Sequence, residues 1–467
     1  MCAIMMLSTV FLLSLCVATC FTTAINGNDW TFNFNNTNIG ELEMGSSTKI
    51  VFYTQTNTTW EDEDLRLQII STDEDVAYPS RHFFNLPQNN SMPSSLWENS
   101  FNLTSEFLGY TKLYLQVVKF ENNTIQYVLN SSEVHMNIKV IRKPQLIDKI
   151  FVICVAVLMT IIFINLGCAL DVDQLKQSVR KPIAPVASFF AQFLILPILS
   201  FIYAKLIFPN SISMQLGLFF TGISPGGGAS SVWSLLLGGN INLSIVLTTI
   251  GTLESFIMIP FWVIFLGKRI FSVGEMPVPY SRIGFSIVAL IIPLCIGYCI
   301  QRFMPRVSRV MTRILKPMSS CLIIFIIIFA TVTNLYLFKI FSWKIILAGA
   351  VIPWTGYLVG LLTSILARLS TPDIISMTVE SGIQNTGIAI FMLKFSLGQP
   401  AADITTVIPV AVALMTPIPL LICFIIKKCF AKKDEIVNNQ DPATESMLNK
   451  KECEVPSANT ENENNQP

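Results

Sequence analysis

The chain has 467 residues, of which 52% are hydrophobic and 13% are charged, and its formal net charge is +1. Soluble domains usually carry about 25% charged residues, so this composition excludes an ordinary soluble protein. The near-zero charge offers no basic surface for a nucleic-acid partner. The apolar residues are concentrated after residue 148, where long apolar runs follow one another.

Residues 1–24 predict a cleaved signal peptide. An apolar run from Met5 to Val17 is followed by the small residues Ala18, Thr19 and Ala24. This run is shorter than the roughly 20 apolar residues that a membrane-spanning helix needs. An uncleaved signal anchor is the alternative interpretation, because the positively charged start typical of a signal peptide is missing.

Residues 25–147 predict a glycosylated extracellular domain. They contain six N-x-S/T sequons, at Asn35, Asn57, Asn89, Asn102, Asn122 and Asn130. A single sequon is a weak signal, but this density indicates exposure outside the cytoplasm. The alternative is that a segment rich in Asn and Thr produces sequons by chance.

The same domain alternates apolar and polar residues with the period of β-strands. The predicted strands are Ile50–Gln55, Leu65–Ile70, Leu113–Phe120, Ile125–Leu129 and Val134–Ile141. Short strands separated by turn residues are typical of a β-sandwich of immunoglobulin-like type. No Cys lies between Phe21 and Ile147, so we expect a core without disulfides.

Residues 148–427 predict a domain of nine membrane-spanning helices. The apolar runs lie at about 148–170, 183–208, 213–238, 241–266, 283–302, 320–338, 343–367, 372–396 and 402–427. With an extracellular N-terminal domain, nine crossings place the C-terminus inside, where Lys427 and Lys428 agree with the excess of positive charge found in cytoplasmic loops. We expect a plasma-membrane location and a disordered cytoplasmic tail at residues 428–467, which are rich in Asn, Glu, Lys and Pro.

Two of the nine runs are interrupted. The third contains Ser224–Ser231 (SPGGGASS) and the eighth contains Glu380–Gly387 (ESGIQNTG). Pro and successive Gly do not continue a helix, and unwound backbone inside a membrane must line a cavity or an ion. Interruptions at matching places in two halves of a chain indicate a transporter's binding site, and here each lies in the middle of three helices, which predicts inverted repeats. Close helix packing at glycine is the alternative explanation.

The only ionisable residues well inside apolar runs are Glu254 and Glu380. Such residues are costly in a membrane and are functional candidates. Hard cations such as sodium prefer several oxygen ligands. Oxygen atoms are available from Ser244 and Thr248 (i, i+4), from Glu380 and Gln384 (i, i+4), and from Ser230 and Ser231 after the first break. We find no catalytic constellation, and the sequence calls for no cofactor and no metal other than sodium.

The ordered motifs Ser224–Ser234 (SPGGGASSVWS), Gly239–Thr249 (GNINLSIVLTT) and Glu380–Asn385 (ESGIQN) resemble the bile acid:sodium symporter family. Leu166–Cys168 and Ala191–Phe193 add to a similarity that covers nearly all of residues 148–427. The glycosylated N-terminal domain resembles the long-headed branch of that family.

The resemblance implies an all-α polytopic fold with a core domain, a panel domain and two broken helices that cross in the core. It implies a first sodium site at Ser230, Ser231, Ser244, Thr248 and Glu380. It implies a second site at Gln192, Glu380 and Gln384, with the backbone carbonyls around Ser381 and Ile383. Glu254 and Asn385 are placed along the substrate path. Ser231 stands where the family's bile acid carriers have Asn.

The sequence therefore predicts sodium-coupled uptake of an organic anion such as a bile acid or a sterol sulfate, by a protein embedded in a lipid bilayer. The second hypothesis is a receptor or adhesion protein that does not transport and acts through its N-terminal domain, whose partner the sequence does not identify. Fold alone does not decide between the two. Uptake by a variant without the N-terminal domain favours transport.

Overall fold

A computed structural model describes residues 30–35, 40–56, 65–86, 97–121, 124–131, 135–143, 146–170, 180, 182–273, 277–313 and 342–429. The predicted signal peptide, the sixth apolar run and most of the predicted tail lie outside these residues. The chain divides into two compact units, one formed by residues 1–149 with 397–404 and the other by residues 150–396 with 405–467.

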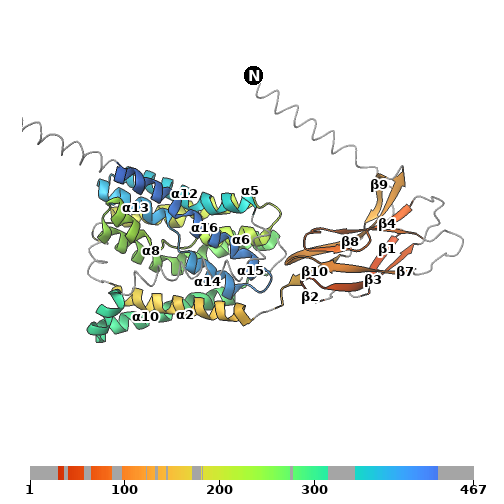
Figure 1. The fold of residues 1–467 in the computed structure, drawn as a ribbon, viewed down its shortest axis with the longest axis horizontal. Coiled ribbons are helices and arrows are strands. Elements are labelled where there is room, and N and C mark those ends of the chain that lie inside the picture. The colour runs from red at the N-terminus through yellow and green to blue at the C-terminus, as the bar shows by residue number, and fades with distance from the viewer. Residues whose placement is uncertain are drawn as a thin grey trace, which may run out of the picture. The chain divides into compact units, whose positions relative to one another are not determined.

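The N-terminal unit is a β-structure of two sheets (Figure 1). Its strands are β1 (Trp30–Phe34), β2 (Glu41–Glu43), β3 (Ser47–Thr56), β4 (Leu65–Ser71), β5 (Ala77–Pro79), β6 (Phe83–Asn85), β7 (Trp97–Ser105), β8 (Gly109–Glu121), β9 (Thr124–Ser131) and β10 (Met136–Ile141). One sheet has the order β1-β3-β7-β5, and the other has the order β2-β10-β8-β4-β6 with β9 also paired to β8. All of these pairs are antiparallel except β10 with β2.

Alternation of buried and exposed side chains explains why these segments form two packed sheets. Along β4 every second residue is buried, as the period of a strand requires. The apolar sides of the strands share one hydrophobic core, in which the Phe52 ring contacts Phe84, Trp97 and Phe101. The β-rich N-terminal unit predicted from the sequence is confirmed.

The second unit is helical. Its helices are α2 (Leu146–Ala169), α4 (Ile183–Phe190), α5 (Leu196–Ile207), α6 (Ile212–Gly222), α7 (Ser230–Leu237), α8 (Ile241–Trp262), α9 (Lys268–Val273), α10 (Tyr280–Phe303), α12 (Trp343–Leu366), α13 (Thr371–Gly382), α14 (Thr386–Ser396) and α16 (Val407–Met415). The short helix α15 (Ala401–Thr405) lies almost wholly in residues 397–404, which are grouped with the N-terminal unit. Residues 305–313 and 417–429 are also helical. Short π-helical segments, η2 (Ala191–Ile195) and η3 (Val263–Gly267), continue α4 and α8.

Six of the described helical stretches are long and apolar enough to cross a membrane. They are Lys149–Ala169, Ile183–Ile207, Ile241–Val273, Tyr280–Phe303, Trp343–Leu366 and Ala401–Cys429. Each corresponds to one predicted run. The two interrupted runs appear as the pairs α6–α7 and α13–α14, so eight of the nine predicted runs are helical, and the run at 320–338 lies outside the described residues.

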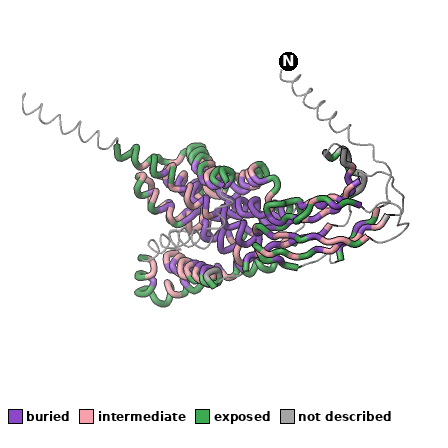
Figure 2. The backbone as a smooth tube through the Cα atoms, turned by 45° about the vertical axis from the view of Figure 1, so that its right-hand side comes forward, coloured by how far each residue is buried: buried purple, intermediate pink, exposed green. Residues whose placement is uncertain are grey.

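Large apolar side chains cover the outside of the helical unit. Ile257 is 73% exposed, Phe285 72% and Leu366 80%. Exposed apolar surface of this extent is unusual in a soluble monomer and suits contact with lipid. By contrast, α6 is buried from Ser213 to Gly222, and in Figure 2 buried backbone is concentrated inside the helical unit.

Small residues allow close contact between α2 and α10, which lie side by side in Figure 1. A Cβ on Gly167 would lie 2.2 Å from the Leu294 carbonyl oxygen, and one on Gly297 would lie 2.0 Å from the Ile164 carbonyl oxygen. Such contacts at glycine are typical of helices packed within membranes. Glycine packing, the alternative considered for the breaks, also occurs in the second break, where a Cβ on Gly382 would lie 2.0 Å from the Tyr357 ring, so it remains open as an explanation.

Candidate functional site

The two breaks lie against each other. Gly226 and Gln384 form an antiparallel bridge. The Gly227 amide donates to the Ile383 carbonyl over 2.7 Å, and the Asn385 amide donates to the Pro225 carbonyl over 2.8 Å. Unwound backbone is tolerated at membrane depth where its polar groups find partners. The two interrupted spans, about 150 residues apart in sequence, thus satisfy each other's freed backbone groups.

Local sequence explains where the second halves begin. Asn385 accepts a hydrogen bond from the Ile388 amide over 3.1 Å and so caps α14, as Asn does at helix starts. The prediction that Asn385 lies on a substrate path remains untested, and the structure adds this capping role. In the first break, Pro225 lacks an amide hydrogen and Gly226 to Gly228 disfavour helix, so α7 begins only at Ser230.

The first cluster of polar residues consists of Ser230, Ser244, Thr248 and Glu380. Glu380 lies at its centre and is 3% exposed. Its Oε2 accepts a hydrogen bond from Thr248 Oγ1 at 2.8 Å and a longer one from Ser244 Oγ at 3.4 Å. Ser230 Oγ lies 3.2 Å from Thr248 Oγ1. Because Ser244 and Thr248 are one turn apart on α8, both reach the same carboxylate. Four residues of the predicted first site therefore lie in mutual contact.

The other oxygen of this carboxylate has no partner. Glu380 Oε1 is buried without a hydrogen bond, and no Lys or Arg of the described chain forms an ion pair with it. Burying an unpaired carboxylate is costly unless a cation or a proton compensates it. The cluster thus bonds one carboxylate oxygen, Oε2, to hydroxyl groups and leaves the other, Oε1, buried and free for another partner.

Gln192 and Gln384 form the second cluster. Gln192 Nε2 donates to Gln384 Oε1 and to the Ser224 carbonyl, both over 2.7 Å, and Gln384 Nε2 donates to the Ser381 carbonyl over 3.0 Å. Gln192 Oε1 is buried without a partner. Gln192 lies in the π-helical segment η2, and π-helical bulges are frequent at functional sites.

Backbone carbonyls complete this second cluster. The Ile383 carbonyl accepts the Gly227 amide, and the Ser381 carbonyl accepts the Gln384 side chain. A carbonyl oxygen has two lone pairs, so each retains one for another partner. The predicted residues Gln192, Ser381, Ile383 and Gln384 are thus brought together beside Glu380.

Ser231 and Glu254 stand apart from these clusters. Ser231 is buried, with 7% exposure, yet within the described chain it makes no hydrogen bond to the Glu380 carboxylate. Glu254 is half-buried on α8 and has no ion pair or hydrogen bond with another described residue. Among the described residues, the structure therefore shows no partner that supports the predicted role of Ser231 at the sodium site or of Glu254 on the substrate path.

Sequence reasoning missed three features of the site. It did not anticipate the π-helical turn at Gln192, the Ser224 carbonyl as a partner of Gln192, or the close approach of Gly226 to Glu380. The run of glycines is a signal for close approach, but the chain carries no comparable local signal for the π-helical turn.

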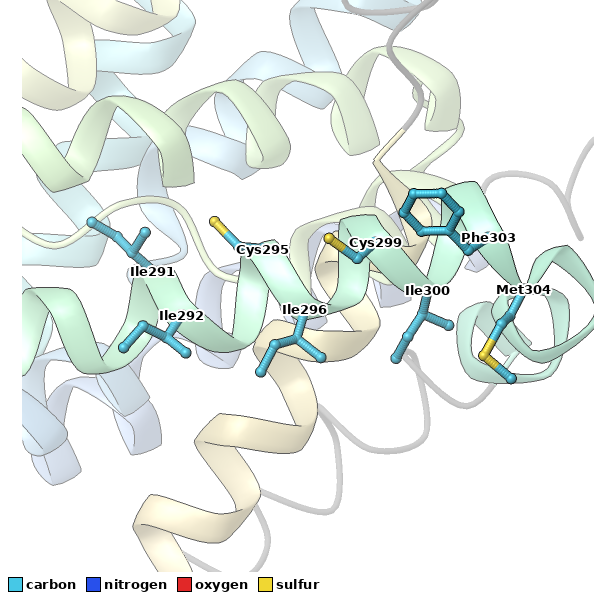
Figure 3. Close-up of a pocket in the computed structure, with 8 residues that line it drawn as sticks. All are labelled: Ile291, Ile292, Cys295, Ile296, Cys299, Ile300, Phe303 and Met304. Atoms are coloured by element: carbon cyan, nitrogen blue, oxygen red, sulfur yellow. The ribbon is translucent and has the colours of Figure 1, made fainter.

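Figure 3 shows a separate apolar groove of about 450 Å³ along α10. In this view Ile291, Cys295, Cys299 and Phe303 project from one side of the helix, and the other lining residues, Ile292, Ile296, Ile300 and Met304, project from the opposite side. Its lining offers no carboxylate, hydroxyl or amide side chain, so it does not suit a sodium ion. No group of three or more His, Cys, Asp or Glu residues that could hold a metal occurs in the described part of the chain.

Residues 156–340 match the model of the sodium bile acid symporter family. This match covers 185 of the 467 residues, all of them in the helical unit. The family is one of sodium-coupled transporters rather than enzymes.

Individual members show how far the likeness extends. The human P3 protein is 31% identical over 261 residues, which are 55% of this chain and 54% of that protein. The rat hepatic sodium/bile acid cotransporter is 26% identical over 294 residues, covering 61% of this chain and 79% of the relative. The human ileal sodium/bile acid cotransporter is 24% identical over 294 residues, covering 62% and 84%. The match thus spans about half the length of P3 protein and most of the two cotransporters.

Proposed function

We propose that this protein is a secondary transporter that couples the inward movement of sodium to the uptake of an amphipathic organic anion. The observation that supports it most directly is the buried, unpaired Oε1 of Glu380, next to three hydroxyl groups and two helix breaks. A hard cation bound there offsets the cost of the buried charge.

Two sodium ions fit the arrangement. The first site uses Glu380 with Ser230, Ser244 and Thr248, and Ser231 joins it if its hydroxyl turns toward the ion. The second uses Glu380, the free Oε1 of Gln192, Gln384 and the carbonyls of Ser381 and Ile383. Sharing Glu380 between both ions makes the two binding events interdependent.

The anion is proposed from the relatives whose names specify bile acid, and because half-helices that begin inside the membrane direct positive dipole ends toward an anionic group. Both α7 and α14 begin at such breaks. We also propose a core domain, a panel domain and inverted repeats for the membrane part, a plasma-membrane location and an extracellular N-terminal unit.

Uptake in cells tests the proposal. A panel of labelled anions, including bile acids and sterol sulfates, is offered in sodium medium and in choline medium. We expect at least one anion to enter faster in sodium. Equal uptake of every anion in both media would contradict sodium coupling.

The receptor hypothesis retains one specific observation in its favour, which is that the N-terminal unit has a hydrophobic core of its own. A variant lacking residues 25–147, checked for surface expression, separates the two functions. Retained sodium-dependent uptake favours transport by the helical unit. An inert helical unit together with a binding N-terminal unit favours the receptor.

A further inference from the structure

Polar residues of three helices continue from Glu380 to the end of the helical unit where α8 and α13 begin. The helices α7, α8 and α13 pack against one another. Asn240, at the start of α8, is one turn before Ser244. On α13, Asp373 and Ser376 share a helical face with Glu380, because residues three, four and seven apart lie on one face. On α7, Ser234 is one turn after Ser230.

At the end where α8 and α13 begin, these polar residues include the carboxylate of Asp373, whose hydrogen-bond donors are neutral side chains. Asp373 Oδ1 accepts Asn240 Nδ2 over 2.8 Å, and its Oδ2 accepts Ser370 Oγ over 2.6 Å. Ser376 Oγ donates to the Asn240 carbonyl over 2.8 Å. Across the described residues Asp373 has no ion pair, and the nearby Lys427 donates to the Leu236 carbonyl over 3.3 Å. The negative charge of Asp373 is thus left without a cationic partner.

Ser234 lies on α7, which packs against α8 and α13, and its hydroxyl is unused. It is fully buried, at 0% exposure, and its Oγ has no hydrogen-bond partner. A buried serine in a helix usually bonds a carbonyl of the preceding turn, as Ser200 on α5 bonds the Pro197 carbonyl. A buried polar atom without a partner calls for a ligand that the protein itself does not supply.

We propose that Ser234, Asn240, Ser376 and Asp373, here called the polar track, conduct the sodium ion between Glu380 and the side of the membrane where α8 and α13 begin. Asp373 is the carboxylate at the end of the polar track where α8 and α13 begin. Ser234 offers an oxygen ligand on the way from that end to Glu380. The inference rests on the proposed function and assigns a route to its coupling ion. In the topology proposed above, that side is cytoplasmic, so the polar track releases sodium into the cell.

Substitution of Asp373 separates conduction from binding. Asp373→Asn keeps the size and hydrogen-bonding capacity of the side chain but removes its charge. We expect the maximal rate of sodium-driven uptake to fall about tenfold while the half-saturating sodium concentration changes less than about twofold, because the Glu380 site is untouched. The matched control Ser370→Ala removes one hydrogen bond to Asp373 but leaves the charge, and we expect a rate near that of the wild type.

Two results would overturn the polar track while leaving sodium coupling intact. One is an Asp373→Asn variant with the wild-type rate. The other is a change in half-saturating sodium as large as the change in rate, which would make Asp373 a positioning residue for the Glu380 site. Absence of any sodium-dependent uptake by the wild type would instead contradict the proposed function.

Thiol labelling tests the middle of the track without relying on transport rates. Ser234→Cys is made in a background where the exposed Cys295, Cys299, Cys423 and Cys429 are replaced by Ser. A small cationic methanethiosulfonate reagent, applied to the side where α8 and α13 begin, reaches a thiol only through water. We expect Ser234→Cys to react and sodium to slow the reaction several-fold. The control Leu235→Cys, at a side chain that is 55% exposed on the outside of α7, should not react, and an equally unreactive Ser234→Cys would overturn the route.

Discussion

Gly226 and Glu380 belong to different broken spans, yet a Cβ on residue 226 would lie 2.2 Å from Oε1 of Glu380 and 3.3 Å from its carbonyl oxygen. No side chain fits at this position while the carboxylate keeps its place. The first break therefore supplies both the unwound backbone that pairs with Gln384 and the space in which the free carboxylate oxygen lies.

Gly226→Ala tests this contact. The added methyl group displaces the Glu380 carboxylate from the Ser244 and Thr248 hydroxyls, so we expect the half-saturating sodium concentration to rise about tenfold, or about 1.4 kcal/mol of binding free energy. Gly251→Ala on α8 is the matched control, because a Cβ there meets no atom within 4 Å. Sodium titration of uptake measures both variants, and equal behaviour would show that the carboxylate does not bind the ion from this side.

Gln192→Ala tests the second cluster. It removes the unpaired Oε1 and the bond to Gln384, while the Glu380–Thr248 contact is left in place. We expect the sodium dependence to lose its sigmoidal shape as one of two ions is lost. Gln301→Ala, which breaks a bond from α10 to the Leu170 carbonyl, is a control of the same chemistry outside the site. A sigmoidal curve for Gln192→Ala would argue against a second ion.

Glu254→Gln tests whether the second intramembrane carboxylate acts on the substrate. No described residue holds Glu254 by an ion pair or a hydrogen bond, and a carboxylate near an anion's path repels the anion unless it is neutral. We expect sodium dependence to be unchanged and the ranking of transported anions to shift toward more highly charged ones. Competition between pairs of labelled anions measures that ranking, and a loss of sodium dependence would place Glu254 in the ion site instead.

Asn102→Gln tests the extracellular placement of the N-terminal unit. Asn102 is exposed on β7 opposite Lys49 of β3, and Asn35 is also exposed, whereas the side chains of the other four sequons lie outside the description. We expect glycosidase to lower the apparent mass of the wild type in several steps, and Asn102→Gln to show one step fewer. A wild-type band that glycosidase leaves unchanged would contradict this topology.

The sequence predicts those parts of the fold that follow from simple periodicity. Apolar runs of membrane length predicted the long helices. Pro225 with three glycines predicted the first break, and the glycine-containing segment Glu380–Gly387 predicted the second, because these residues disfavour a regular helix. The alternation of apolar and polar residues predicted β3, β4, β8, β9 and β10. It missed the short strands β2, β5 and β6, which have three residues each, and it also missed β1 and β7.

The site was predictable in composition but not in contacts. Spacing places Ser244 with Thr248 and Glu380 with Gln384, since residues four apart share a helical face. Which oxygen atoms remain without partners depends on how α7, α8 and α13 pack, and on the π-helical turn that presents Gln192. Those are tertiary properties that no local pattern encodes.

The most direct test of sodium binding at this site is uptake by Glu380→Gln in sodium and in choline. The substitution keeps the shape of the side chain and its contact with Thr248, and it removes the charge that both proposed ions share. We predict normal surface expression and no difference in uptake between the two media. Sodium-stimulated uptake by Glu380→Gln at the wild-type rate would contradict the account.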